Sequence, residues 1–277
     1  MDRVTHLISA RDLAHSLHDV VVLDVRYQLG GPDGRLEYAR GHVPGAHYVD
    51  LDTELAGPPG EGGRHPLPDP SVVEAALRRA GVDDHSRVVA MDGRESYAAA
   101  RAWWVLRWLG LGAVRVLDGG FAAWQRADLP VSTETPDDGA GTFTARPGQL
   151  PVLDADAAAR LAQTGVLLDS RAAERFRGEV EPIDPVAGRI PGAVSSPTSE
   201  WLAPDGTFRR DLAEHWRQVV ADRDTSAVGA YCGSGVTAAH QVLALAEINV
   251  DAVLYPGSWS EWIRDPSRPV ATGPTPG

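Results

Sequence analysis

Residues 228–237 read VGAYCGSGVT, and a run rich in alanine and leucine continues to residue 247. This order predicts a buried strand, a tight loop and a helix. Gly233 and Gly235 relieve crowding in the loop, so that its backbone can turn inward and point several N–H groups at one anion. The first turn of the helix adds unpaired N–H groups and the positive end of the helix dipole. The stretch therefore predicts an anion site between a strand and a helix.

Cys232 stands where the predicted strand ends, and it is the only cysteine in the 277 residues. A thiol in this position should lose its proton readily, because the surrounding N–H groups favour the thiolate. The usual state of a lone cysteine is a small buried apolar side chain. A core cysteine needs no glycine-rich loop around it, so we interpret Cys232 as a nucleophilic sulfur in a preformed anion site.

Composition limits the classes of partner. The chain has 38 acidic and 26 basic residues and a formal net charge of −12, which disfavours nucleic acid and anionic membranes as partners. No stretch approaches the roughly 20 apolar residues of a membrane helix. Residues 1–10 carry charges at Asp2 and Arg3 and do not have the pattern of a secretory signal. We therefore expect a soluble, cytoplasmic protein.

Other ligand signatures are weak. One cysteine excludes an internal disulfide, and the nine histidines form no pair at metal-ligand spacing. The Gly110-x-Gly112 pair lacks the third glycine of a dinucleotide fingerprint. The sequence therefore predicts no metal site and no cofactor.

The second half of the chain repeats the first at an offset of roughly 140 residues. Five landmarks recur in the same order: 21–26 as 166–171, 41–46 as 188–193, 88–93 as 228–233, 117–120 as 254–258, and 129–131 as 268–270. Each half alternates strand-like and helical segments, which is typical of an α/β unit with a mostly parallel sheet flanked by helices.

The first half shows the element pattern most clearly. Apolar runs predict strands at 20–24, 88–91 and 113–117. Capping residues and periodicity predict helices at 10–17, 70–80, 98–109 and 121–126. Glycine-rich and proline-rich composition predicts loops at 27–40 and 57–68.

The segment Cys-Gly-Ser-Gly-Val-Thr-Ala at 232–238 closely resembles the active-site loop of the rhodanese family of sulfurtransferases, in particular its mercaptopyruvate branch. The repeat resembles that family's tandem architecture over nearly the whole chain. The resemblance implies rhodanese-like domains at 1–135 and 150–277, with a linker at 136–149. It implies that the second domain is catalytic. Asp92 stands at the place of Cys232 in the first domain and offers no sulfur, so that domain is expected to be inactive, either as a wall of the cleft or as a binding module.

The resemblance also implies the reaction. A thiolate attacks the outer sulfur of a donor and becomes a persulfide, and an acceptor then removes that sulfur. We expect Cys232 to take sulfur from a small anionic donor, 3-mercaptopyruvate or thiosulfate, and to pass it to cyanide, a thiol or a thioredoxin-like protein. The loop amides are expected to bind the donor and the persulfide; they belong to Gly233, Gly235, Val236 and Thr237.

In the mercaptopyruvate branch, a serine, a histidine and an acid form a relay that handles protons. The matching residues here are Ser234, His65 in the loop 63–68, and Asp52, with Asp50 as the alternative acid. Without the resemblance, His65 is interpreted as a solvated loop residue, and Asp52 as a turn or capping residue.

Arg175 matches one of two arginines that hold the mercaptopyruvate carboxylate in relatives, a role that suits the planar guanidinium group. The second arginine is absent from its usual spacing, where Asp184 stands instead. Arg189 replaces the usual histidine of a Gly-His-Ile-Pro-Gly motif and is the candidate substitute. The alternative for each arginine is an ion pair at a surface or an interface.

Three other functions remain open. One is a thiosulfate-specific rhodanese. The second is a sulfur carrier or binding module without turnover. The third, a cysteine phosphatase or arsenate reductase, is disfavoured, because such enzymes close the loop with an arginine and none lies between Cys232 and Ala238.

Overall fold

The computed structural model describes residues 5–274, so the first four residues of the stretch examined for a secretory signal lie outside it. The chain forms two compact units. The first holds the described residues up to Gly57, with Leu67–Leu150 and Ala203–Phe208. The second holds Pro58–Pro66, Pro151–Leu202 and the described residues from Arg209 onward.

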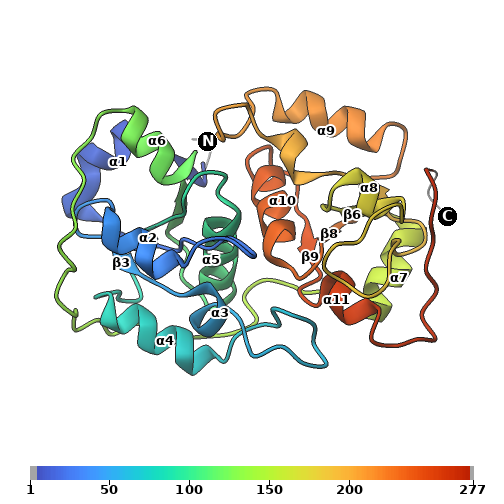
Figure 1. Ribbon diagram of the computed structural model, residues 1–277, viewed down its shortest axis with the longest axis horizontal. Coiled ribbons are helices and arrows are strands. Elements are labelled where there is room, and N and C mark those ends of the chain that lie inside the picture. The colour runs from blue at the N-terminus through green and yellow to red at the C-terminus, as the bar shows by residue number, and fades with distance from the viewer. Residues whose placement is uncertain (1–4, 275–277) are drawn as a thin grey trace. The chain divides into compact units, whose positions relative to one another are not determined.

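The first unit has a five-stranded parallel sheet in the order β1-β5-β4-β2-β3. Figure 1 labels β3, at one edge of this sheet, and the helices α1 to α6 of this unit. The strands are β1 (Leu7–Ile8), β2 (Val21–Asp24), β3 (His47–Tyr48), β4 (Val88–Met91) and β5 (Val114–Leu117). β4 is buried along its whole length, which explains its uninterrupted apolar sequence.

Helices flank this sheet. They are α1 (Ala10–Ser16), α2 (Gly34–Arg40), α3 (Leu51–Glu54), α4 (Pro70–Arg79), α5 (Tyr97–Trp108) and α6 (Gly120–Arg126), and a 3-10 turn, η1, follows α1 at Leu17–Asp19. The helices predicted at 10–17, 70–80, 98–109 and 121–126 are confirmed to within one or two residues. α1 begins after Ser9, whose side chain accepts from the Asp12 amide, as the capping pattern predicts.

The loop predicted at 27–40 is wrong in its second half, where the structure has α2. The carboxylate of Asp33 accepts hydrogen bonds from the amides of Arg35 and Leu36, so it caps the helix. Gly34 at the first helical position and the glycines before it concealed this helix from composition alone.

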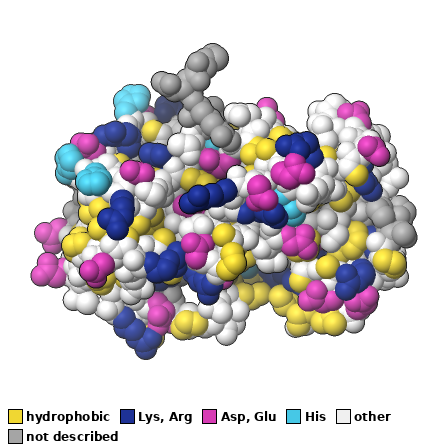
Figure 2. Space-filling view, turned by 90° about the horizontal axis from the view of Figure 1, so that it is seen from above, with side chains coloured by type: hydrophobic (Ala, Val, Ile, Leu, Met, Phe, Trp, Pro, Cys, Tyr) yellow, Lys and Arg dark blue, Asp and Glu magenta, His cyan; other side chains and the backbone are white. Residues whose placement is uncertain are grey.

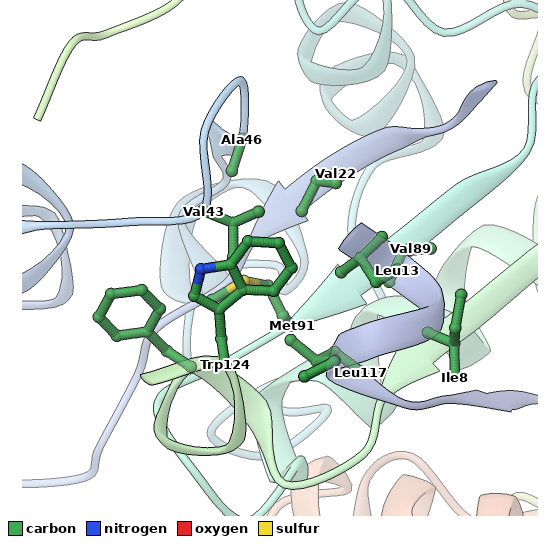
Figure 3. Packing of buried hydrophobic residues seen from close by; sticks show 11 residues of the cluster. Ile8, Leu13, Val22, Val43, Ala46, Val89, Met91, Leu117 and Trp124 are labelled. Atoms are coloured by element: carbon green, nitrogen blue, oxygen red, sulfur yellow. The ribbon is translucent and has the colours of Figure 1, made fainter. Parts of the chain in front are cut away.

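A core of apolar side chains lies between the sheet of the first unit and the helices α1 and α6. Figure 3 shows the ring of Trp124 within this cluster, with Val43, Met91 and Leu117 near it. The indole Nε1 of Trp124 donates to the carbonyl of Pro130 at 2.7 Å, so its polar atom is satisfied inside the core.

The second unit has a four-stranded parallel sheet in the order β7-β6-β8-β9. Its strands are β6 (Val166–Asp169), β7 (Val194–Ser195), β8 (Val228–Tyr231) and β9 (Val253–Leu254). Its helices are α7 (Ala155–Thr164), α8 (Ala173–Phe176), α9 (Leu212–Val220), α10 (Val236–Ala246) and α11 (Ser258–Trp262), with a 3-10 turn, η2, at Thr198–Trp201.

The internal repeat is confirmed by topology. The order β3-β2-β4-β5 of the first sheet matches β7-β6-β8-β9 of the second. A parallel bridge between Val152 and Leu254 takes the place of the β1–β5 pair. The predicted fold, two tandem α/β domains with mostly parallel sheets, is therefore correct.

A buried ion pair also recurs in both units. In the first, Arg26 binds both carboxylate oxygens of Asp24 and donates to the carbonyl of Gly41 at 2.7 Å. The same contacts in the second unit join Asp169, Arg171 and Gly188. Each pair ties the end of a strand to the following loop.

The surface carries charges of both signs. Figure 2 shows basic and acidic side chains interspersed on the face that it draws. Exposed pairs such as Arg217–Glu214 contribute little to stability, because water screens them. Among the described residues, the helices are too short or too polar to cross a membrane.

Because of His240 in α10, the free energy of unfolding is expected to depend on pH. Its side chain is fully buried, and burial lowers its pKa from 6.5 to about 3. As the pH falls below about 6.5, the unfolded chain binds a proton that the folded chain does not, so the free energy of unfolding falls by about 1.4 kcal/mol per pH unit. His240→Leu should remove this contribution in urea unfolding followed at a series of pH values.

His18→Gln is the matched control, because the His18 side chain is 77% exposed. The change in pH dependence caused by His240→Leu should exceed any change caused by His18→Gln. An identical pH dependence for His240→Leu and the wild type would contradict the prediction.

Candidate active site

Cys232 follows β8 directly, at the carboxyl end of a parallel strand. Its side chain is only 2% exposed, and its Sγ accepts a hydrogen bond from the amide of Gly235 at 3.1 Å. Gly235 has φ +79°, and a Cβ there would stand 2.4 Å from the carbonyl oxygen of Pro256. Only glycine fits this turn without strain, so the second glycine of the loop holds an amide against the sulfur.

The start of α11 holds the loop in place. The amide of Cys232 donates to Ser258 Oγ at 3.1 Å. The amides of Trp259 and Ser260 donate to the carbonyls of Cys232 and Gly233 at 3.0 and 2.9 Å. These bonds restrain the loop on both sides of the sulfur, so the position of the nucleophile is set by the backbone.

The first unit shows what this turn does with an anion. Asp92 follows β4 as Cys232 follows β8, and it is buried. Burial raises the pKa of Asp92, while four backbone N–H groups at 3.0–3.3 Å oppose that rise. Those amides belong to Arg94, Ser96, Ala98 and Ala99. The strand–turn–helix unit therefore presents a ring of donors to one negative charge.

The two loops differ by one residue. α10 is preceded by Gly235, three residues after the cysteine, whereas α5 is preceded by Ser96, four residues after Asp92. Both residues have positive φ, +79° and +62°. The shorter loop brings the helix start closer in sequence to the sulfur.

His65 belongs to the second unit, because the segment 58–66 packs there rather than with its sequence neighbours. Gly63 has φ +95°, and a Cβ on it would lie 2.7 Å from both the Gly257 carbonyl and Ser260 Oγ. The amide of Arg64 donates to the same Ser260 Oγ at 3.0 Å. The segment is therefore anchored on the N-terminal end of α11.

This anchoring brings His65 to the cysteine loop. Nδ1 of His65 and Oγ of Ser234 are hydrogen-bonded at 2.7 Å, and both side chains are buried. Ser234 is two residues after Cys232. Two of the three predicted relay residues thus lie together beside the nucleophile.

The predicted acid lies in the first unit. Asp52 is an exposed residue of the short helix α3. Asp50, the alternative, caps that helix by accepting from the amide and the hydroxyl of Thr53 at 3.0 and 2.9 Å. The carboxylate of Asp50 therefore already has a structural role.

Two arginines converge on the residue after the cysteine. A Cβ placed on Gly233 would lie 2.7 Å from Nη2 of Arg64 and 3.7 Å from Nη2 of Arg175. Sequence reasoning found Arg175 and missed Arg64. The signal that could have identified Arg64 was its position next to His65, in a segment already expected at the site.

Acidic side chains accompany these arginines. Glu181 binds Arg175 through both oxygens, at 3.0 and 2.6 Å, and Asp184 binds both Arg64 and Arg175. Burial opposes ionisation of Glu181, but hydrogen bonds from Arg175 and the Asp184 amide outweigh it and lower its pKa. Burial raises the pKa of Asp184 in spite of its two arginine partners, with the Glu181 carboxylate adding to the rise.

Arg189, predicted among the substrate-binding residues, has a packing role instead. Its side chain is fully buried, and Nη1 donates to the carbonyls of Gly273 and Phe176 at 2.7 and 3.4 Å. Its guanidinium carbon lies 4.3 Å from the centre of the Phe176 ring. A side chain sealed in this way is not accessible to a donor.

The first unit contains a cavity of about 370 Å³ beside Gly93. Its charged lining residues already have partners, since Arg26 binds Asp24 and Arg40 binds Glu37. Within residues 5–274, His, Cys, Asp and Glu side chains form no group of three that could hold a metal ion.

Comparison with known proteins identifies the family. The model of the rhodanese-like domain matches residues 9–127 and 154–265. A probable 3-mercaptopyruvate sulfurtransferase of Pseudomonas aeruginosa is 45% identical over 96% of this chain and 98% of its own length. The putative thiosulfate sulfurtransferase SseB of Mycobacterium tuberculosis is 44% identical over 96% of this chain and 97% of its own.

A solved structure agrees with this result. The crystal structure of SseA, the 3-mercaptopyruvate sulfurtransferase of Escherichia coli, superposes with a TM-score of 0.79 at 32% identity, covering 93% of this chain and all of that one. Two domain matches and full-length relatives lead to one conclusion: the chain belongs to the rhodanese family of sulfurtransferases and consists of two rhodanese-like domains in tandem.

Proposed function

We propose that this sulfurtransferase takes sulfur from 3-mercaptopyruvate, carries it as a persulfide on Cys232 and delivers it to a thiol acceptor. The observation that carries the choice of donor is the hydrogen-bonded pair of Ser234 and His65 beside the cysteine loop. A donor whose leaving group must gain a proton needs such a pair.

The first step follows from the chemistry of the donor. The Cys232 thiolate attacks the donor sulfur, and a new S–S bond forms as the S–C bond breaks. The electron pair of the broken bond goes to the methylene carbon, which leaves the enolate of pyruvate. This enolate takes up a proton to become pyruvate, and His65 delivers that proton through Ser234.

The second step restores the enzyme. An acceptor nucleophile attacks the outer sulfur of the persulfide, and the electron pair of the S–S bond returns to Cys232 as the thiolate. The amide of Gly235, at 3.1 Å from Sγ, stabilises the negative sulfur in both steps without rearranging. A small thiol or a thioredoxin-like protein is the proposed natural acceptor, and cyanide can replace it in an assay. A single free cysteine of this kind suits the reducing cytoplasm.

Thiosulfate is the second candidate donor, in line with the name of the Mycobacterium tuberculosis relative. Its sulfonate group fits two arginines as well as a carboxylate does. Sulfite, its leaving group, is a stable anion and needs no proton from a relay. The Ser234–His65 pair is therefore the feature that separates the two donors.

The first unit is proposed to be inactive in sulfur transfer. The Asp92 carboxylate satisfies the amides of its own loop, so that loop has neither a sulfur nor an open anion site. Its cavity of about 370 Å³ supports the alternative of a separate binding module.

Replacement of the nucleophile is the direct test. Cys232→Ser should abolish sulfur transfer from both donors to cyanide, because no other cysteine exists to carry sulfur. Intact mass spectrometry after exposure to donor should show one added sulfur atom on the wild type and none on the variant. Asp92→Asn, the matched change in the first unit, should keep sulfur transfer. Turnover by Cys232→Ser would refute the assignment.

Variants of the relay separate the donors. Ser234→Ala and His65→Gln should lower kcat/KM for 3-mercaptopyruvate by about 100-fold, the usual contribution of positioned acid–base groups. With thiosulfate the loss should be small. His85→Gln, at an exposed histidine of the first unit, is the control. Equal losses with the two donors would exclude the relay.

The same assay tests the acid. Asp52→Asn should share the selective loss with 3-mercaptopyruvate. Asp50→Asn should leave stability and the use of both donors nearly unchanged, because asparagine caps a helix about as well as aspartate does. A selective loss in Asp50→Asn alone would transfer the role to that residue.

A further inference from the structure

Arg64 and Arg175 come from distant parts of the sequence and meet over Gly233. Arg64 lies in the segment 58–66, and Arg175 lies in α8. A side chain at position 233 would displace the guanidinium group of Arg64, whose Nη2 is 2.7 Å from the place of a Cβ. Gly233 therefore leaves room for a guanidinium group next to the nucleophile. Two such groups form a natural site for the charged end of a donor whose sulfur is at Cys232.

The Asp184 side chain of the protein itself occupies the position between these two guanidinium groups. Asp184 Oδ1 binds Nη1 of Arg64, and Asp184 Oδ2 lies 3.3 Å from Nη2 of Arg175. The Asp184 side chain is only 4% exposed. One carboxylate thus bridges two arginines with its two oxygens, as the carboxylate of a bound donor would.

Asp184 is held less firmly than its neighbour Glu181. Glu181 binds Arg175 through both oxygens and also accepts from the amides of Ile183 and Asp184. In the described part of the chain, the hydrogen bonds to the Asp184 carboxylate come from the two arginines. Burial raises the pKa of Asp184, whereas the pKa of Glu181 is lowered.

The backbone of Asp184 also permits movement. The residue lies in irregular chain between α8 and β7, outside any helix or strand. Its carboxylate can leave the arginines without breaking regular secondary structure. The amide of Asp184 stays bound to Glu181, which keeps the loop near the site.

We propose that Asp184 is a displaceable internal anion: the carboxylate or sulfonate of the sulfur donor takes its place on Arg64 and Arg175 during sulfur transfer. This inference rests on the proposed function in one respect, namely that the donor at Cys232 carries such a group. Asp184 then sets the affinity for donors, and Arg64 is a donor-binding residue.

Charge balance explains why an enzyme keeps such an acid. Arg64 and Arg175 carry two positive charges, and Glu181 and Asp184 carry two negative ones. Without Asp184, the empty site would hold a partly buried positive charge with no partner, which is unfavourable. With it, an incoming donor exchanges one anion for another and the cluster stays neutral. The acid stabilises the empty site and weakens donor binding.

The test measures anion binding apart from turnover. In the Cys232→Ser background, isothermal titration gives the affinity for pyruvate and for inorganic sulfate. Asp184→Asn should bind both anions about tenfold more tightly, a difference of about 1.4 kcal/mol. Arg64→Gln should bind them about tenfold more weakly. Glu179→Gln is the matched control, because this exposed acid pairs with Arg177 and contacts neither Arg64 nor Arg175 in any ion pair of the described residues.

The double variant keeps the test decisive. Arg64→Gln with Asp184→Asn removes one charge of each sign, so it should fold even where Asp184→Asn does not. It should bind anions more tightly than Arg64→Gln alone, because the competing carboxylate is gone. No gain over Arg64→Gln in the double variant, or no gain in a folded Asp184→Asn, would overturn the proposal.

Kinetics in the Cys232 enzyme provide an independent readout. Asp184→Asn should lower KM for the donor without raising kcat, whereas a purely structural role would not lower KM. Absence of turnover with both donors would count against the proposed function and leave the binding result intact.

Discussion

In each unit, the turn between a parallel strand and a helix depends on backbone N–H groups that donate to the side chain at the end of the strand. In the second unit the acceptor is Cys232 Sγ, and the donor is the amide of Gly235. In the first unit the same turn encloses the carboxylate of Asp92, which accepts from four amides. The two loops differ in length by one residue. The proposed difference in function lies in the side chain, since a carboxylate offers no sulfur and a thiol does.

A second constraint is charge balance beside that turn. Ionised side chains alternate in sign from the buried end of β6 to the cysteine loop. In order they are Asp169, Arg171, Glu181, Arg175, Asp184 and Arg64. Because partly buried charges are costly when unpaired, each member depends on its neighbours. Under the role proposed for Asp184, affinity for an anionic donor depends on how easily this acid is displaced, in a chain whose net charge of −12 repels anions at long range.

Much of the fold follows from local pattern. Uninterrupted apolar runs predicted β4 and β8, and capping residues predicted α1 and α4, because burial and unsatisfied helix ends impose the same demands in any context. The helix α2 was not predicted, since Gly34 and the glycines before it resemble loop composition. The sequence signal for this helix is the cap at Asp33. Arg189 was misassigned because sequence spacing does not reveal whether a guanidinium group faces a ligand or packs on Phe176.

The sequence by itself predicted Cys232 as the nucleophile, its loop and the duplication, since a cysteine at the end of a strand, followed by Gly233 and Gly235, is a local pattern that restricts the backbone. Only the tertiary structure showed that Arg64 reaches that loop and how His65 is brought to it. The segment 58–66 packs with the second unit through contacts of Gly63 and Arg64 with residues almost 200 positions away, and it brings His65 with it. Such contacts leave no periodic pattern in the chain, because they depend on where two distant pieces of backbone meet after folding.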